Sequence, residues 1–173
     1  MEFKRLTSSN HDLYKEAIAL YKDSFPYHEQ RKPKSQIEIM RNNSYYFYLI
    51  FYEQIWVGNL LCWQTDDFIY VEHFCILPTM RNQKYGERAL SLLATFGKPV
   101  ILEIDPPIDD ISCHRQNFYE RAGFQANPFV HIHPPYHEEC AGHALVVMSY
   151  PSVLSQEQYD KFNNYLIDVV MGQ

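Results

Sequence analysis

The sequence lacks the features that mark disulfide-rich, membrane-spanning and nucleic-acid-binding proteins. It has only four cysteines and no Cys-x-x-Cys pair, and Cys62 and Cys75 fall in predicted strands, where we expect reduced core thiols. No apolar run approaches the roughly 20 residues of a membrane helix, and residues 1–7 contain no apolar signal region. The net charge of −6 argues against non-specific binding to nucleic acid. We therefore expect a cytoplasmic protein that binds neither membranes nor nucleic acids.

The 173 residues also lack internal repeats, linkers and low-complexity tracts. A chain of this length usually folds as one domain around one core. Apolar residues make up 46% of the chain, which predicts a globular fold. We therefore predict a single domain over residues 1–173, in which residues from about 152 form a helical appendage.

Hydrophobic periodicity and turn residues predict the order of the elements. The predicted strands cover residues 2–6, 45–52, 55–64, 68–76, 100–104, 125–133 and 144–150. Helices are predicted over residues 10–25 and 35–41, and others begin near residues 87, 112 and 155. Asn10 or Ser9, Ser112 and Ser155 are the predicted helix caps.

The most informative segment runs from Glu72 to Leu93 and reads as a strand, a tight polar turn and a helix. Such a turn aims unpaired backbone N–H groups and the positive end of the helix dipole at one point. That point suits a phosphate or pyrophosphate group. Arg81 and Lys84 would add positive charge beside it.

Two motifs carry a resemblance to a known family. The turn, Ile76-x-Pro78-x-x-Arg81-x-x-Lys84-x-Gly86, resembles the coenzyme A pyrophosphate loop of the GNAT superfamily of N-acetyltransferases. This chain departs from the family pattern at one position, because Lys84 replaces the first glycine and adds a side chain where backbone normally approaches phosphate.

The second motif spans residues 117–124, Asn-Phe-Tyr-Glu-Arg-Ala-Gly-Phe, and resembles the family's aromatic-Tyr-Glu-x-x-Gly-Phe element. Gly123 is placed to take the left-handed conformation that ends a helix. The resemblance covers about residues 3–148. It implies an α/β (α+β) fold: a mixed, mostly antiparallel sheet of about seven strands flanked by helices, to which this chain adds a C-terminal helix.

The resemblance implies acetyl transfer from acetyl-coenzyme A to an amine, with no metal. Glu72 is the candidate base, directly or through water, and Tyr119 the candidate acid for the leaving thiolate. The predicted cofactor contacts are Phe74, Ile76, Arg81, Asn82, Lys84, Tyr85, Gly86, Glu87 and Ser112. The predicted substrate contacts are Glu29, His133 and Tyr136. The expected acceptor is a small-molecule amine, and only the resemblance suggests a homodimer.

Regular strand alternation places Tyr70, Glu72, Phe74 and Ile76 on one face and His73 on the other. A carboxylate in this otherwise apolar strand is costly unless it is solvated or partnered. A glutamate on a solvated face is therefore the alternative to a base at Glu72. Tyr119 has an alternative role as a core aromatic residue, and Ser112 has one as a plain helix cap.

Two alternative functions remain at the level of the sequence. The first is a catalytically inactive protein that binds an acyl-coenzyme A, which the replacement of glycine by Lys84 favours. The second is a metal-binding protein built on His131-x-His133-x3-His137-x2-Cys140-x2-His143, since imidazole and thiol groups at short spacing suggest zinc. That spacing matches no known zinc pattern, and two prolines interrupt it.

Overall fold

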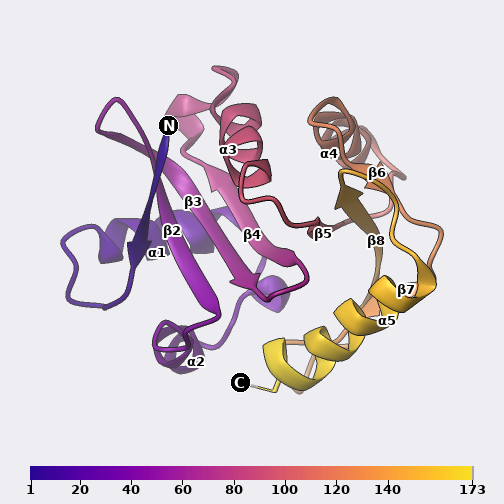
Figure 1. Cartoon of the computed structure of the whole chain (residues 1–173). Coiled ribbons are helices and arrows are strands. Elements are labelled where there is room, and N and C mark those ends of the chain that lie inside the picture. Colours follow the sequence, from indigo (N-terminus) through magenta and orange to yellow (C-terminus); the bar gives the residue numbers. More distant parts are fainter. Residues whose placement is uncertain (173) are drawn as a thin grey trace.

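Eight strands form one mixed sheet in the order β1-β2-β3-β4-β5-β8-β6, with β7 also paired to β8 (Figure 1). The computed structural model describes residues 1–172. The strands are β1 Glu2–Leu6, β2 Tyr45–Tyr52, β3 Ile55–Gln64, β4 Ile69–Ile76, β5 Val100–Ile104, β6 Gln125–Ala126, β7 His131–His133 and β8 His143–Tyr150. The helices are α1 Tyr14–Ser24, α2 Pro33–Ile39, α3 Tyr85–Ala94, α4 Asp110–Arg121 and α5 Gln156–Tyr165, which continues as a π-helix over Leu166–Val170. The predicted order of elements and the mostly antiparallel sheet are confirmed.

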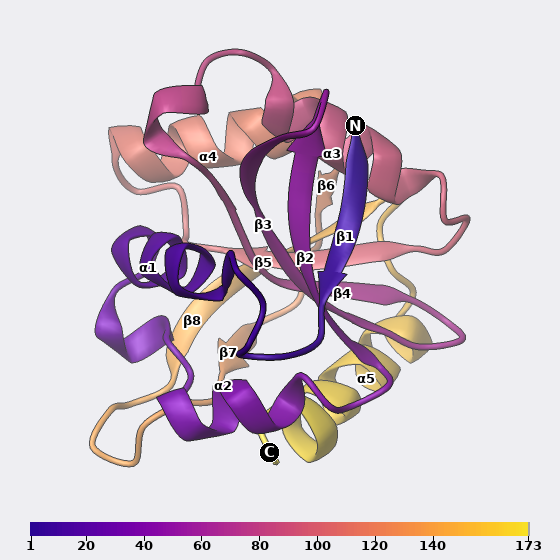
Figure 2. The same cartoon turned by 90° about the vertical axis from the view of Figure 1, so that its left-hand side faces the viewer.

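The helices cover both faces of the sheet (Figure 2). One hydrophobic core contains residues of α1, α2 and α5, including the fully buried Tyr21, Ile39 and Phe162. The other core contains residues of α3 and α4, including Leu93 and Tyr119. The apolar stripe of the C-terminal helix therefore packs on the sheet. No helix within residues 1–172 has both the length and the apolar character needed to cross a membrane.

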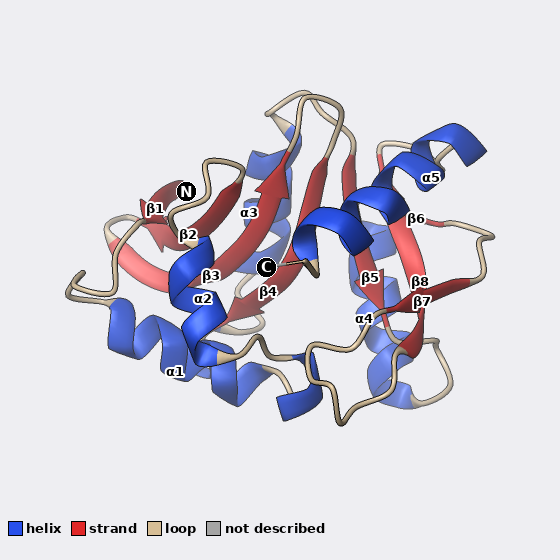
Figure 3. Cartoon of the chain, turned by 90° about the horizontal axis from the view of Figure 1, so that it is seen from below, coloured by secondary structure: helices blue, strands red, loops and turns tan. Residues whose placement is uncertain are grey.

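The sheet opens between its two central strands. β4 and β5 are parallel and pair only through Ile69–Val71 and Val100–Leu102, and all other strand pairs are antiparallel. Within residues 1–172, the edge of β4 that faces β5 has no strand partner beyond Val71. The half of the sheet formed by β1 to β4 and the half formed by β5 and β8 lie on either side of this divergence (Figures 1 and 3).

A β-bulge sits at the point of divergence. In the β3–β4 register Leu61 opposes His73 and Cys62 opposes Val71, so Glu72 is the extra residue. An extra residue reverses the alternation of side chains beyond it. The prediction that Tyr70, Glu72, Phe74 and Ile76 share one face is therefore wrong.

The two faces after the bulge follow from the packing. Tyr70 belongs to the core beneath α1 and α5, whereas Phe74 and Ile76 pack against the core beneath α3 and α4. His73 lies on the α1 side, where its ring meets the rings of Tyr21 and Phe25 at centroid distances of 4.9 Å and 4.6 Å.

Three local predictions also need correction. Residues 125–133 form two short strands because Pro128 has no N–H, and the Asn127 side chain bonds instead to Val147 and Ser149. Helix α1 begins at Tyr14 and has no side-chain cap. The N-cap of α4 is Asp109, and Ser112 is the third helical residue of the same capping box. The capping box predicted at Ser155 is confirmed.

Candidate functional site

Two cavities meet where β4 and β5 diverge. The larger one, which we call the loop cavity, encloses about 640 Å³ between the turn after β4 and one face of α4. The smaller one, which we call the inner cavity, encloses about 290 Å³ between β4, β5, the start of β8 and the turn after α1. Six residues line both: Phe74, Cys75, Ile76, Arg81, Arg115 and Tyr119. A ligand in the loop cavity can therefore reach the inner cavity.

Two residues of the turn that lines the loop cavity adopt a backbone conformation that glycine favours, although neither of them is glycine. Asn82 and Lys84 both have φ of 62°, in the left-handed region that non-glycine residues rarely adopt. Lys84 is the N-cap of α3, and no side chain caps this helix end. The N–H groups at the start of α3 are thus left for an anion, and the exposed Lys84 side chain adds positive charge there.

Gly86 allows α3 to pack closely against α4. A Cβ atom at this position would lie 3.0 Å from Cζ of Phe118 and 3.7 Å from Cζ of Phe74. Of the nine residues predicted to contact a cofactor, eight line the loop cavity; the exception is Ser112. The Ser112 hydroxyl instead exchanges hydrogen bonds with Asp109 within the capping box of α4, and the residue is buried.

Sequence reasoning missed the contribution of α4 to the loop cavity. One side of this helix supplies the lining residues Ile111, His114, Arg115, Phe118 and Arg121. Their spacing of three and four residues is the signature of one helix face. The available signal in the sequence was this spacing, with the apolar Ile111 two turns before Phe118; in the structure Ile111 is 73% accessible. Arg115 and Arg121 make this wall positive.

The backbone around Tyr119 is fixed by the end of α4. Gly123 has φ of 91°, its N–H donates to the carbonyl of Glu120, and the N–H of Phe124 donates to the carbonyl of Tyr119. These two bonds form a Schellman motif, as the Gly-Phe pair predicted. The Tyr119 ring packs against Phe118 and Phe124 at centroid distances of 5.0 Å and 5.7 Å.

The Tyr119 hydroxyl is available at the junction of the cavities. Tyr119 lines both cavities and is only 9% exposed. Burial raises its pKa to about 12, against a smaller opposing effect of Arg115. The phenol is therefore protonated at neutral pH and can serve as a donor.

Glu72, the predicted base, is held in a buried ion pair. Its Oε1 accepts from Nε of Arg31 at 2.9 Å and from the hydroxyl of Tyr136 at 2.8 Å, and its Oε2 accepts from Nε1 of Trp63 at 2.7 Å. The side chains of Arg31 and Glu72 are 3% and 1% exposed. Burial opposes charge on Glu72, but Arg31 and the hydrogen bonds outweigh it, so its pKa lies below the usual value.

Arg31 extends this network to the C-terminus of the described chain. Its Nη2 donates to the carbonyl of Val170 at 2.6 Å, in the π-helix that follows α5. The guanidinium also lies over the rings of Trp63 and Tyr136, 5.7 Å and 5.4 Å from their centroids. Sequence reasoning could not identify Arg31, because its partners are 41 and 139 residues away.

The predicted substrate residues Glu29, His133 and Tyr136 all line the inner cavity. A second buried carboxylate, Glu103, lies in the same wall and accepts hydrogen bonds from Tyr70 and His131. Burial opposes its charge, but the bond with His131 outweighs this effect and lowers the pKa of Glu103. The wall of the inner cavity therefore contains several carboxylates.

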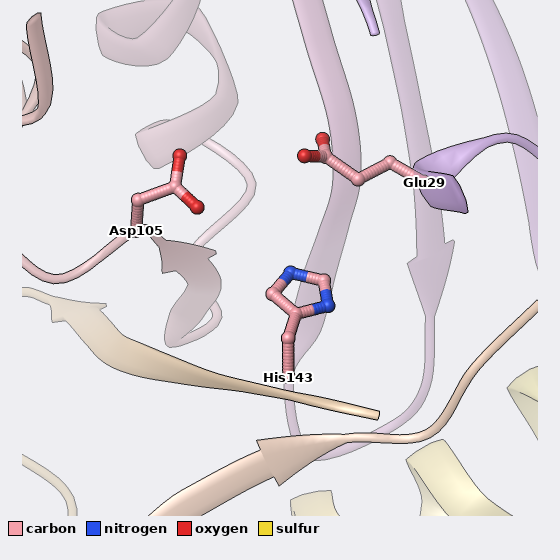
Figure 4. Close-up of side chains that lie close together, drawn as sticks. All are labelled: Glu29, Asp105 and His143. Carbon is pink, nitrogen blue, oxygen red and sulfur yellow. The ribbon is translucent and has the colours of Figure 1, made fainter. Parts of the chain in front are cut away.

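Asp105 and His143 also line the inner cavity, and both were missed as substrate contacts. Figure 4 shows their side chains and that of Glu29 pointing toward a common space. Asp105 also pairs with Arg115, whose Nη1 lies 2.5 Å from its Oδ2. His143 had been assigned only to the possible metal cluster.

The other members of that cluster have different partners. His131 bonds to Glu103 and Tyr159, His133 to the Pro134 carbonyl, and His137 to the Tyr27 carbonyl. In the described part of the chain, only Glu29, Asp105 and His143 come together in a way that could hold a metal ion. The alternative grouping of residues 131–143 around one metal is therefore not seen among residues 1–172.

Comparisons with known proteins identify structures of similar fold. A structure of a Bacteroides thetaiotaomicron protein described as a GNAT-family acetyltransferase is 30% identical, covers 100% of this chain and 99% of its own, and has a TM-score of 0.94. An aminoglycoside 6'-N-acetyltransferase complexed with coenzyme A is 16% identical, with 86% and 96% of the two chains covered and a TM-score of 0.60.

The ribosomal-protein-S18-alanine N-acetyltransferase of Escherichia coli is also 16% identical, with 90% and 96% of the two chains covered and a TM-score of 0.56. A search of curated proteins found no match. The model of the acetyltransferase (GNAT) family matches residues 11–124, which is most of the chain. With that match and the 30% identical structure, the chain belongs to the acetyltransferase (GNAT) family.

Proposed function

We propose that this protein transfers the acetyl group of acetyl-coenzyme A to a primary amine of a small molecule by direct attack. The observation that carries the proposal is the meeting of the two cavities at Phe74–Ile76 and Tyr119. A pyrophosphate at the start of α3 would direct the rest of the cofactor along the loop cavity toward this junction. The amine would approach from the inner cavity.

The loop supports binding of acetyl-coenzyme A despite Lys84. Its left-handed backbone is the conformation that a glycine would adopt, so the N–H groups of α3 stay accessible. The aminoglycoside acetyltransferase of similar fold was solved with coenzyme A. That enzyme also acts on an amine of a small molecule, which supports the same class of acceptor here.

The backbone of β4 would stabilise the charge that develops on the acetyl oxygen. In the part of the chain that the structure describes, the edge of β4 toward β5 has no strand partner beyond Val71, so its N–H groups near Phe74 and Ile76 can donate to a ligand. Donors fixed in place before the reaction are an effective form of transition-state stabilisation. This contribution does not depend on side chains.

Tyr119 would protonate the leaving thiolate. A phenol with a pKa of about 12 is a poor acid toward a thiol of ordinary pKa, roughly 8.5, and the gap corresponds to about 5 kcal/mol. The thiolate would form in the same buried place, where burial raises its own pKa and narrows the gap. Position at the junction supports this role more than acidity does.

We assign Glu72 a positioning role in place of proton abstraction. Three donors occupy its carboxylate, and a lowered pKa makes it a weak base. Its bond to the hydroxyl of Tyr136 fixes one wall of the inner cavity. The proton of the amine must then go to another group.

The test is release of thiol from acetyl-coenzyme A in the presence of a panel of small primary amines. Tyr119→Phe keeps the packing and removes the hydroxyl, so kcat should fall about 100-fold while KM for acetyl-coenzyme A stays constant. Tyr150→Phe is the control, since Tyr150 packs on the same Phe124 but lines neither cavity. Binding of acetyl-coenzyme A without turnover of any amine would favour the inactive acyl-coenzyme A-binding protein.

A further inference from the structure

Three titratable side chains converge at one end of the inner cavity. Glu29 comes from the short turn Tyr27–Glu29, Asp105 follows β5, and His143 begins β8 (Figure 4). One oxygen or nitrogen atom from each lies within 4.8 Å of those of the other two. All three residues are only partly buried, so a ligand can reach them.

His73, which bonds to the backbone of Glu29, lies in the wall of the same cavity. Its Nε2 bonds to the carbonyl of Glu29 at 2.8 Å. This bond fixes the proton on Nε2, so Nδ1 is an acceptor, yet among residues 1–172 it has no hydrogen-bond partner and is fully buried. Buried polar atoms without partners are rare in native proteins.

We propose that Glu29 and Asp105 bind the ammonium form of the acceptor amine and that His143 removes its proton. The inference rests on the proposed function and names the recognition and base groups of that same site. The three come from distant segments, which explains why no motif marks them.

The charge balance favours an ammonium ion over a divalent metal. The guanidinium of Arg115 lies 2.5 Å from Asp105 and lines the same cavity, so it would repel a nearby divalent cation. Two carboxylates and one guanidinium leave a single negative charge in excess. A monovalent ammonium ion matches that excess, and its N–H groups can bond to both carboxylates.

His143 is suited to accept a proton. Burial lowers its pKa below the ordinary value, which keeps the imidazole neutral at neutral pH. The charged and titratable groups that face it are Glu29, His28, His133, Glu103 and Asp105. The two histidines lower its pKa further and the acidic residues Asp105 and Glu103 raise it, with a net decrease.

The protons balance in this scheme. The bound ammonium gives one proton to His143, and the neutral amine attacks the acetyl carbon to form the C–N bond. The C–S bond then breaks, the thiolate takes the proton of Tyr119, and the second proton of the nitrogen restores the phenol. His143 releases its proton to solvent, so each turnover liberates one proton.

A binding experiment tests recognition without turnover. The probe is 2-phenylethylammonium chloride, titrated into protein saturated with coenzyme A; its aromatic arm suits a cavity lined by Phe25, Tyr70 and Phe74. The readout is the side-chain ¹⁵N signal of His143, assigned by its loss in His143→Gln. We expect a saturable shift with the amine and none with the uncharged 2-phenylethanol.

Variants of the two carboxylates sharpen that experiment. Glu29→Gln and Asp105→Asn should each weaken the amine at least tenfold, whereas Glu38→Gln, an exposed glutamate on α2, should not. Equal shifts with amine and alcohol, or unchanged affinity in both variants, would overturn the inference. A His143 shift with zinc chloride but none with the amine would also overturn it and assign a metal site.

A pH profile tests the base. With any amine of the panel that is acetylated, kcat/KM of the wild-type protein should fall as the pH drops below the ordinary histidine pKa. In His143→Gln, kcat should be lower and this pH dependence should disappear. If kcat/KM of His143→Gln still falls at acid pH as in the wild-type protein, His143 is not the base, although the proposal of acetyl transfer is not contradicted. If acetyl-coenzyme A fails to raise the melting temperature of the wild-type protein, the proposed function fails first.

Discussion

The two cavities are built in different ways. The wall of the loop cavity comes mainly from residues 74–87 and one face of α4, and its geometry follows from local backbone conformation. The wall of the inner cavity is assembled from α1, β4, β5, β8 and the loops beside them, and a buried ion pair fixes its floor. Local geometry can be predicted from short motifs, whereas a wall that depends on distant contacts cannot.

The difference also implies different sensitivity to substitution. Changes in the loop cavity should have small, local effects, because each residue there depends on few others. Changes in the inner cavity should spread, because Arg31 links β4, the loop that carries Tyr136 and the π-helix after α5. The following predictions test this contrast, from the largest expected effect to the smallest.

The largest effect is expected from Glu72→Gln. It leaves the Arg31 guanidinium buried without its counter-charge, and breaking such a pair typically costs about 3–5 kcal/mol. Urea unfolding should show this loss, and the double variant Arg31→Met/Glu72→Leu should recover part of it. Glu157→Gln, an exposed glutamate in the first turn of α5, is the control and should change stability by less than about 0.5 kcal/mol.

The same variant decides between the two roles of Glu72. If Glu72→Gln unfolds like the wild-type protein but loses turnover, most visibly at low pH, the carboxylate is a base and the positioning role is wrong. A loss of stability with a pH profile parallel to that of the wild-type protein would support positioning.

A smaller, opposite effect is expected from Lys84→Gly. The left-handed backbone of Lys84 costs a non-glycine residue about 1 kcal/mol, so glycine should stabilise the protein by up to that amount. Lys34→Gly, in the right-handed helix α2, should instead destabilise by about 1 kcal/mol. Chemical unfolding gives the change in the free energy of unfolding for both variants. A change of the same sign in both would contradict the idea that the left-handed backbone at Lys84 is locally strained.

The smallest effect is a dependence of stability on pH. Burial lowers the pKa of His73 and of His143, so the unfolded chain takes up protons first as the pH falls below about 6.5. The free energy of unfolding should therefore be highest above that pH. It should fall as the pH approaches the lower pKa values that these two histidines have in the folded protein. The pKa values of Glu72 and Glu103 are also lowered in the folded protein, so their contribution to stability should be lost only at lower pH, below about pH 4.

Substitution of His73 distinguishes the loss of stability caused by the histidines from the loss caused by the glutamates at lower pH. His73→Phe keeps an aromatic ring among Tyr21 and Phe25 and should reduce the decline between about pH 6.5 and 5. The exposed His11→Phe should leave it unchanged. Denaturant unfolding across pH gives both curves, and identical declines in His73→Phe and the wild-type protein would exclude His73 as a cause.

Much of the fold and of the loop cavity could be predicted from the sequence. The order of elements and the end of α4 at Gly123 depend on short-range patterns, and eight of the nine predicted cofactor contacts line the loop cavity. The side on which Phe74 and Ile76 lie could not be predicted, because the β-bulge at Glu72 leaves no clear trace in a strand of alternating residues. Nor could the convergence of Asp105 and His143 with Glu29, which requires the path of the whole chain.

Thermal unfolding with and without acetyl-coenzyme A tests the central claim most directly. A ligand that binds only the native state stabilises it by about 2.7 kcal/mol at 100 times its dissociation constant. The account predicts a clear rise in the melting temperature of the wild-type protein, with the turn around Lys84 holding the pyrophosphate. An unchanged melting temperature at millimolar acetyl-coenzyme A would contradict it, because the loop cavity would then not hold the acetyl donor.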